Sequence, residues 1–146
     1  MRKYSWFVCI MLACVLLTSC IKNTFHLSND VSTIETIEIV QITGYDLENK
    51  LYIWDTLYQS DDNNSFAKEL LALPTTHPFR PPLQIDYGWI AIYIEYKDDT
   101  SQLISCYEQV KMNTQGIVGY QHFHFNNEQY KAFIHKYVDV TFPEMS

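Results

Sequence analysis

The chain has 146 residues, with 17 Asp and Glu against 10 Lys and Arg, which gives a formal net charge of −7 at pH 7. This acidic balance argues against nucleic acid as a partner, because nucleic-acid binding needs clustered cations that displace counterions. It also argues against adsorption of the protein body to anionic lipid. The length suits one domain with a core of its own and is short for two.

Residues 1–19 have the pattern of an export signal. Arg2 and Lys3 provide a positive start, and an unbroken apolar run follows from Trp6 to Leu17. A membrane-spanning helix needs about 20 apolar residues, whereas a run of roughly 10–14 is typical of a signal peptide. Polar residues follow the run immediately, which favours a cleaved signal over an uncleaved membrane anchor.

The segment ends in Leu17-Thr18-Ser19-Cys20, an aliphatic residue and two small ones followed by a cysteine. This motif resembles the lipobox of bacterial lipoproteins. The resemblance implies that the chain is cleaved before Cys20 and that a diacylglycerol, for example one with palmitoyl chains, is attached to the Cys20 sulfur. It also implies that the new amino terminus is often acylated. Two acyl chains anchor a protein stably where one holds it only marginally. A plain secreted protein with a chance cysteine is the alternative.

We therefore expect residues 1–19 to be a lipoprotein signal peptide, residues 20–30 a lipidated tether, and residues 31–146 a single domain outside the cytoplasm. Of the four cysteines, two leave with the signal and one carries lipid, so only Cys106 remains a thiol and no intramolecular disulfide can form. Cys106 has apolar neighbours, and we expect a small buried side chain rather than a nucleophile.

Two strands are predicted at the start of the domain. Residues 31–43 are rich in β-branched side chains, and the strand they predict is expected to end at residues 44–46. Residues 51–58 alternate between aliphatic and aromatic side chains and predict a second strand. Its aliphatic row (Leu51, Ile53 and Leu57) is expected to face the core.

A short helix is predicted next. The turn at residues 61–65 ends in good helix-capping residues, and Phe66, Leu70 and Leu73 would share one side of the helix that follows. Pro74 ends it. The further prolines up to Pro82 make the next segment irregular or extended, because each removes a hydrogen-bond donor and restricts its predecessor.

A three-strand antiparallel meander is then expected. Residues 88–97 alternate most clearly, residues 101–110 return as the partner strand, and residues 117–125 form the third strand. A two-residue loop between the first two strands would place Ile94 opposite Leu103. This register pairs apolar residues with each other.

A final helix is predicted over residues 127–138, with Asn126 as its cap and a continuous apolar stripe. The order is strand, strand, helix, three-strand meander, helix. It predicts an α+β fold: a mainly antiparallel sheet of about five strands, with two helices packed on one face.

Three features resemble a group of uncharacterised small lipoproteins of Gram-positive bacteria. They are the helix Phe66-xxx-Leu70-xx-Leu73-Pro74, the hairpin strand Ile92-x-Ile94-x-Tyr96-x-Asp98, and the ending Phe123-x-Phe125-Asn126-x-Glu128-xx-Lys131-xx-Ile134-x-Lys136-Tyr137. Members commonly have glycine where Asp99 stands here. The resemblance implies structure and location, because the group brings no known activity.

Aromatic residues provide the main candidate site. On the faces opposite the aliphatic rows of their strands lie five rings, which are Tyr52, Trp54, Tyr58, Trp89 and Tyr93. If the helices cover the aliphatic side, these rings line an open sheet face, and rigid rings favour contacts with protein or glycan. The alternative is that the rings pack on one another or under residues 74–87.

Catalytic patterns are weaker. His122 and His124 would project from one face of a strand, as metal ligands often do, with His77 or His135 as conceivable third ligands. The pairs Asp61-Asp62 and Asp98-Asp99 fall in predicted turns, where solvated aspartates are normal. Glu95 shares a face with Trp89 and Tyr93 and is the acid to inspect. No metal, cofactor or catalytic residue is assigned.

The sequence therefore predicts a membrane-anchored, extracytoplasmic lipoprotein of the cell envelope that acts as a binding or accessory domain. Protection of the producer against a secreted toxin, or assistance to an envelope enzyme or transporter, would fit. The alternative is a small envelope hydrolase that uses Glu95 or a histidine-bound metal, and a purely structural envelope component is the third class. The sequence names neither the partner nor the oligomeric state.

Overall fold

A computed structural model describes residues 25–76 and 88–143, and within them the main element is a six-stranded antiparallel sheet in the order β2-β1-β4-β5-β6-β7. The predicted signal peptide, Cys20 and most of the proline-rich segment lie outside these ranges. The strands of the sheet are β1 (Ile34–Asp46), β2 (Leu51–Gln59), β4 (Ile90–Tyr96), β5 (Ser101–Ile104), β6 (Glu108–Asn113) and β7 (Gly116–His122).

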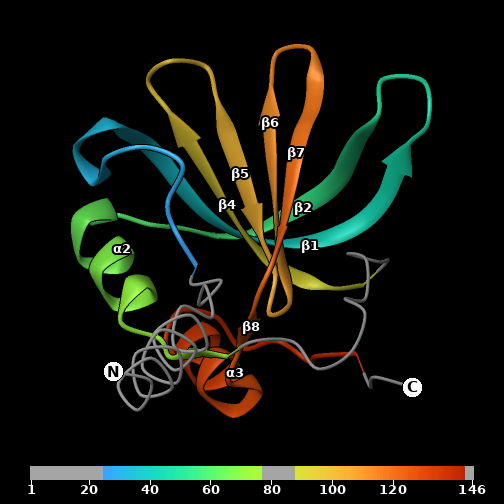
Figure 1. Ribbon diagram of the computed structural model, residues 1–146. Coiled ribbons are helices and arrows are strands. Elements are labelled where there is room, and N and C mark those ends of the chain that lie inside the picture. Colours follow the sequence, from blue (N-terminus) through green and yellow to red (C-terminus); the bar gives the residue numbers. More distant parts are fainter. Residues whose placement is uncertain (1–24, 77–87, 144–146) are drawn as a thin grey trace, which may run out of the picture.

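The helices α2 (Asn63–Leu71) and α3 (Asn127–His135) pack on the same face of this sheet (Figure 1), so the predicted α+β fold is confirmed. Both begin at the kind of cap that the sequence indicates. The Asp62 carboxylate accepts a hydrogen bond from the Ser65 backbone N–H at 3.0 Å, and the Asn126 side chain accepts one from Gln129 at 3.1 Å. Each cap satisfies a backbone donor that a helix start leaves open.

The main core lies between the helices and the sheet. Alternation along β4 directs Ile90, Ile92, Ile94 and Tyr96 to the helix side, where all are buried as expected. Helix α2 adds Phe66 and α3 adds Phe133, and their rings meet edge to face at 5.0 Å. This helix-side core is the larger of the two apolar clusters in the described part of the chain.

The first strand differs from its prediction at both ends. It begins after a short 3-10 turn, η1 (Val31–Thr33), and it continues through Gly44 to Asp46 instead of ending there. Gly44 pairs with Ile53 next to an irregularity in the ladder, which keeps the strand intact where the sequence indicates a break. The turn comes later, where the Asp46 carboxylate accepts hydrogen bonds from the backbone N–H groups of Glu48 (2.9 Å) and Asn49 (3.1 Å).

The predicted register of the β4–β5 hairpin is wrong by one residue. Ile94 pairs with Gln102, and Leu103 pairs with Tyr93. The loop has three residues rather than two, because the Tyr96 N–H donates to the Thr100 carbonyl (2.9 Å) and Asp99 adopts a left-handed conformation with φ 61°. A third loop residue in this conformation is the usual way to close such a loop, and glycine adopts it most readily.

The predicted strand over residues 101–110 is in fact two strands, so the meander has four strands and not three. The Ser105 hydroxyl turns the chain by accepting hydrogen bonds from the N–H groups of Tyr107 and Glu108, both at 3.2 Å. The Ser105 N–H in turn donates to the Glu108 carbonyl at 2.8 Å. Because a serine side chain forms this turn and the segment contains no glycine or proline, the turn cannot be predicted from the composition of the segment.

The third predicted strand is also divided. Strand β7 ends at His122, and β8 (His124–Phe125) leaves the main sheet to pair with β3 (Thr75–Thr76). Phe123, between them, is fully buried in the helix-side core. The expected turn at residues 113–116 is present, and Gly116 takes a φ of 115° there.

Phe25, inside the segment predicted as a tether, belongs to the packed domain. Phe25 is buried, with its ring 5.4 Å from those of Phe123 and Phe125. The buried Gln102 side chain holds the adjoining backbone, because its Nε2 donates to the His26 carbonyl at 3.0 Å and its Oε1 accepts from the Ser28 N–H at 3.0 Å. The tether predicted to reach residue 30 is therefore partly a component of the core.

Candidate functional site

The face of the sheet opposite the helices carries a second, smaller apolar cluster. Its buried members come from four strands, and they are Val40, Ile42, Ala91, Leu103, Val110 and Met112. Four of the five predicted aromatic residues pack against this cluster and are half-buried, and they are Tyr52, Trp54, Trp89 and Tyr93. We call this side of the sheet the aromatic face. Its rings contact one another, with Trp54 and Tyr93 at 4.8 Å between ring centroids.

Tyr58 is the exception, because it lies on the helix side. It pairs with Ile39, whereas the next pair along the ladder is Val40 with Thr56, so Leu57 is an extra residue in β2. An extra residue reverses the alternation of a strand, which moves Tyr58 to the opposite face from Trp54. The Tyr58 ring instead packs against Tyr137 at 5.2 Å.

The expectation that the aliphatic residues of β2 all face the core is also wrong. Ile53 lies between Tyr52 and Trp54 and so points away from the aromatic face, yet its side chain is 51% exposed. Leu57, by contrast, packs against the helix-side core. The difference arises because Ile53 is near the start of β2, next to the β1–β2 turn, and this part of the strand lies away from α2 and α3 (Figure 1).

Two tyrosines that the sequence reasoning did not single out extend the aromatic face. Tyr45 on β1 pairs with Tyr52 on β2, and their ring centroids are 5.2 Å apart. Tyr120 on β7 pairs with Val110 on β6. Tyr45 is 41% and Tyr120 56% exposed. Tyr45 fell in a predicted break and Tyr120 in a strand whose inward face was not assigned; correct strand pairing is the signal that would have found both.

The aromatic face is concave, because the two ends of the sheet approach each other. A Cβ atom placed on Gly116, in the β6–β7 turn, would lie 3.4 Å from the Asn49 carbonyl oxygen in the β1–β2 turn. Tyr52 and Tyr120 thereby come close enough to interact. Burial raises the pKa of Tyr52, and the nearby Tyr120, Glu108 and Tyr45 raise it further, so the Tyr52 phenol is a neutral hydrogen-bonding group at physiological pH.

Two carboxylates border the rings at one end of the face, beside Tyr93. Glu38 pairs with Tyr93 on the neighbouring strand and accepts a hydrogen bond from the Thr56 hydroxyl at 2.8 Å. Glu95, the acid chosen from the sequence, is half-buried beside them and accepts a 3.4 Å hydrogen bond from the Thr36 hydroxyl. This exposure suits a surface carboxylate that contacts a ligand.

The most deeply buried acid of the described residues was not predicted. Glu108 is 1% exposed at the start of β6, and its Oε2 lies 3.4 Å from Nδ1 of His122 on β7. Burial of a carboxylate is costly unless a partner compensates it, so this pair is a specific feature of the fold. The burial of Glu108 could not be predicted from the pattern of one continuous strand over residues 101–110, because Glu108 is instead the first residue of a separate strand.

The two histidines that the sequence offers as conceivable metal ligands lie on different strands. His122 is on β7 beside Glu108, whereas His124 is on β8 with its ring 4.8 Å from that of Tyr107. His135 lies exposed at the end of α3, and His77 is outside the described residues. Over residues 25–76 and 88–143, no three His, Cys, Asp or Glu side chains come together as a metal site would require.

Cys106 is buried, as expected, in the turn between β5 and β6. Burial raises the pKa of its thiol to about 12, and the nearby Lys131 only partly opposes the shift. The thiolate is the reactive form of cysteine, so Cys106 is unsuited to nucleophilic catalysis near neutral pH.

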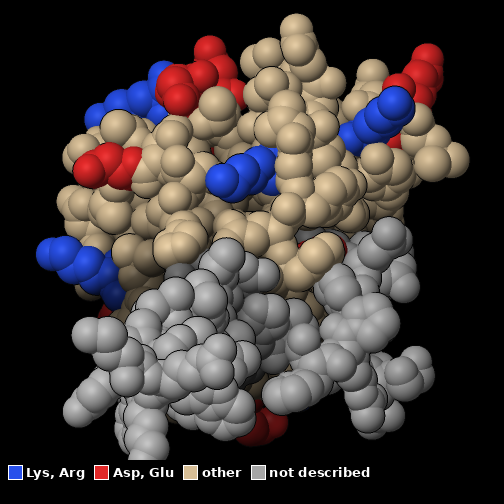
Figure 2. Space-filling model, viewed as in Figure 1, with Lys and Arg blue, Asp and Glu red and all other residues tan. Residues whose placement is uncertain are grey.

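Comparison of the chain with models of known protein families, with curated proteins and with solved structures finds no match. In the part of the chain that the structure describes, no helix has the length and apolar character needed to span a membrane. Acidic and basic side chains are interspersed over the surface seen in Figure 2, without one continuous basic patch in that view. The geometry of the aromatic face therefore remains the main guide to function.

Proposed function

We propose that this chain is an extracytoplasmic lipoprotein, anchored through Cys20, that binds a protein partner with the aromatic face of its sheet. The observation that carries the proposal is a concave cluster of partly exposed rings on the side of the sheet that neither α2 nor α3 covers. Such rings contribute large contact areas and lose little conformational entropy on binding. An accessory or immunity role in the cell envelope would use a surface of this kind.

The charges at the margins of the face favour a partner segment that bears Arg or Lys. Burial raises the pKa of the Tyr93 phenol, and the nearby carboxylates of Glu95 and Glu38 raise it further. A cation attracted by these carboxylates would also lie within reach of the Tyr93 and Trp54 rings, where cation–π contacts stabilise it. A glycan partner, which would use the rings without the carboxylates, is the other outcome of the test.

The position of Phe25 in the domain supports this function. Because Phe25 is packed on the helix side of the sheet, only residues 20–24 separate the lipidated cysteine from the domain. Five residues reach about 17 Å when extended. Anchored this way, the helix side would be directed toward the membrane, and the aromatic face would be directed away from it toward a partner.

The anchor is tested by metabolic labelling. Radiolabelled palmitate is expected to enter the wild-type protein and not the Cys20→Ala variant, and the wild type should require detergent for extraction from membranes. The Cys14→Ala variant is the matched control, since this cysteine would leave with the signal. Label retained in Cys20→Ala would contradict the lipid anchor.

The binding face is tested by site-specific photo-crosslinking in cells of the producing bacterium. A photoreactive amino acid at position 54 or 120 is expected to capture the same protein, identified by mass spectrometry, and the crosslink should weaken when Glu38 and Glu95 are both changed to Gln. Position 53 is the matched control, because Ile53 is exposed but points to the opposite side. Equal capture from positions 53 and 54 would contradict a role for the aromatic face.

A further inference from the structure

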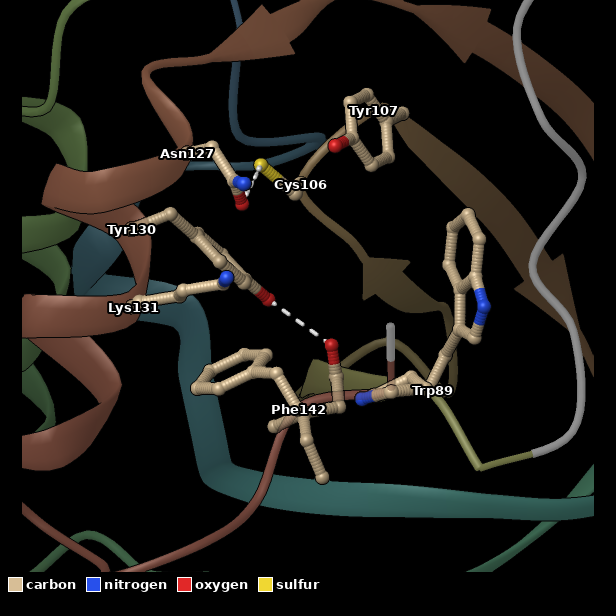
Figure 3. Close-up of a pocket in the computed structure, with 9 residues that line it drawn as sticks. Trp89, Cys106, Tyr107, Asn127, Tyr130, Lys131 and Phe142 are labelled. Atoms are coloured by element: carbon tan, nitrogen blue, oxygen red, sulfur yellow. Dashed lines mark hydrogen bonds between the residues drawn. The ribbon is translucent and has the colours of Figure 1, made fainter. Parts of the chain in front are cut away.

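A pocket of about 130 Å³ opens at the edge of the domain, away from the centre of the aromatic face. It lies between the start of β4, the turn between β5 and β6, the first turns of α3 and the segment that follows α3. Figure 3 shows side chains from all four parts directed around the same space. An engineered cavity of about 150 Å³ with apolar walls binds benzene, so this pocket has the size for one aromatic ring.

Four aromatic rings contribute to the pocket wall. Trp89 and Tyr107 lie on one side of the pocket, with their ring centroids 5.8 Å apart. Tyr130 and Phe142 lie on the other side, with their ring centroids 6.4 Å apart. The Tyr130 hydroxyl is already engaged, since it lies 3.3 Å from the carbonyl oxygens of both Ile90 and Ile104. An occupant therefore meets apolar surface on these sides and gains no hydrogen bond from Tyr130.

The polar groups at the wall are donors. Lys131 lies along the pocket, with its ammonium 5.6 Å from the centre of the Phe142 ring. Among the described residues, no carboxylate lies within ion-pair distance of this ammonium. The Asn127 amide adds a further donor, and Asn127 is the first residue of α3, where the helix dipole is positive. A half-buried lysine that forms no ion pair with any carboxylate of the described residues is favourable for a bound anion.

We propose that this pocket binds a small organic anion whose apolar part is about one ring in size, such as an arenecarboxylate. The ring fills the space between Trp89 and Phe142, and the carboxylate accepts hydrogen bonds from Lys131 and Asn127. Binding is reversible and involves no covalent step, because the buried Cys106 thiol at the wall is not a nucleophile. Trp89 borders both this pocket and the aromatic face, but Lys131 and Asn127 belong to the pocket alone, so loss of the Lys131-dependent preference for benzoate and loss of the protein partner are separate outcomes.

The test is an NMR titration of the isotope-labelled protein with benzoate and with its neutral analogue benzyl alcohol. Benzoate is expected to shift the Trp89 indole and Asn127 amide signals and to bind about tenfold or more tightly than benzyl alcohol, which is the range of a hydrogen bond to a charged group. Lys131→Met should remove this preference for benzoate and leave the affinity for benzyl alcohol within about twofold. Phe142→Ala should weaken both ligands.

Lys68→Met is the matched control, because it removes the same charge from an exposed position on α2, away from the pocket. It should leave both affinities unchanged. Equal affinity of the wild-type protein for benzoate and benzyl alcohol would overturn the proposal, and this comparison requires no variant to fold. Equal weakening of benzoate by Lys68→Met and Lys131→Met, or no signal change at the highest soluble benzoate concentration, would overturn it as well.

Discussion

The two faces of the sheet differ in how completely they exclude water. On the helix side, Phe66, Phe123 and Tyr130 are all at most 1% exposed, and they interlock with β1 and β4. On the aromatic face the buried centre is small and its surrounding rings remain partly exposed, up to 56% for Tyr120. The helix side is therefore the fully packed core of the domain, whereas the aromatic face keeps part of its ring surface exposed.

The largest expected effect is on the helix side. Phe66→Ala should lower the free energy of unfolding by about 3–5 kcal/mol, because it leaves a cavity at a fully packed contact with Phe133 and Tyr137. Urea denaturation followed by circular dichroism measures this. Leu47→Ala is the control, since Leu47 is 84% exposed, and its effect should stay within about 0.5 kcal/mol. Similar losses in the two variants would break the comparison.

A smaller loss is expected on the aromatic face. Trp54→Ala should cost about 1–2 kcal/mol, because the ring is only half-buried and its main partner is Tyr93. The same urea experiment checks this, with Ile53→Ala as the neighbour that points the other way. The variant should stay folded while it loses the crosslinked partner. If it unfolds as readily as Phe66→Ala does, the rings belong to the core and the binding proposal fails.

The smallest effect is expected at a turn that sets the register of both faces. Asp99 occupies the left-handed region, which costs a residue with a Cβ atom more than it costs glycine. Asp99→Gly should therefore raise the free energy of unfolding by about 0.5 kcal/mol. Thermal denaturation measures the change, and Asp61→Gly, in the turn before α2, is the comparison variant. A loss of stability in Asp99→Gly would mean that the aspartate side chain contributes more than the strain costs.

Local signals in the sequence predicted the starts of both helices and the clearest strand, whereas α3 ends at His135 and not at residue 138 as expected. Asp62 and Asn126 cap their helices because a side-chain acceptor near free N–H groups acts over a few residues. The alternation of β4 is also a local property, because neighbouring side chains in a strand point to opposite faces, and it places Ile92 and Ile94 correctly on the helix side. The α+β class follows from the order of such elements.

The features that the sequence patterns did not predict depend on contacts between residues that are not neighbours in the chain. The extra residue at Leu57 exists only relative to β1, so counting along β2 alone assigned Tyr58 to the wrong face. The turn at Ser105 depends on a hydroxyl that closes two hydrogen bonds, and no glycine or proline marks it. The candidate site was therefore only partly predictable: Trp54 and Tyr93 were found, and Tyr45 and Tyr120 were not.

Neighbouring residues and overall composition were sufficient to predict where the helices start, the alternation of β4, the acidic charge and the expected lipid anchor at Cys20. Only the tertiary structure decided that the aromatic face is concave, that Glu108 is buried beside His122, and that Lys131 borders a ring-lined pocket. These features join residues far apart in the chain, and their distances are determined by the curl of the sheet and the packing of α3.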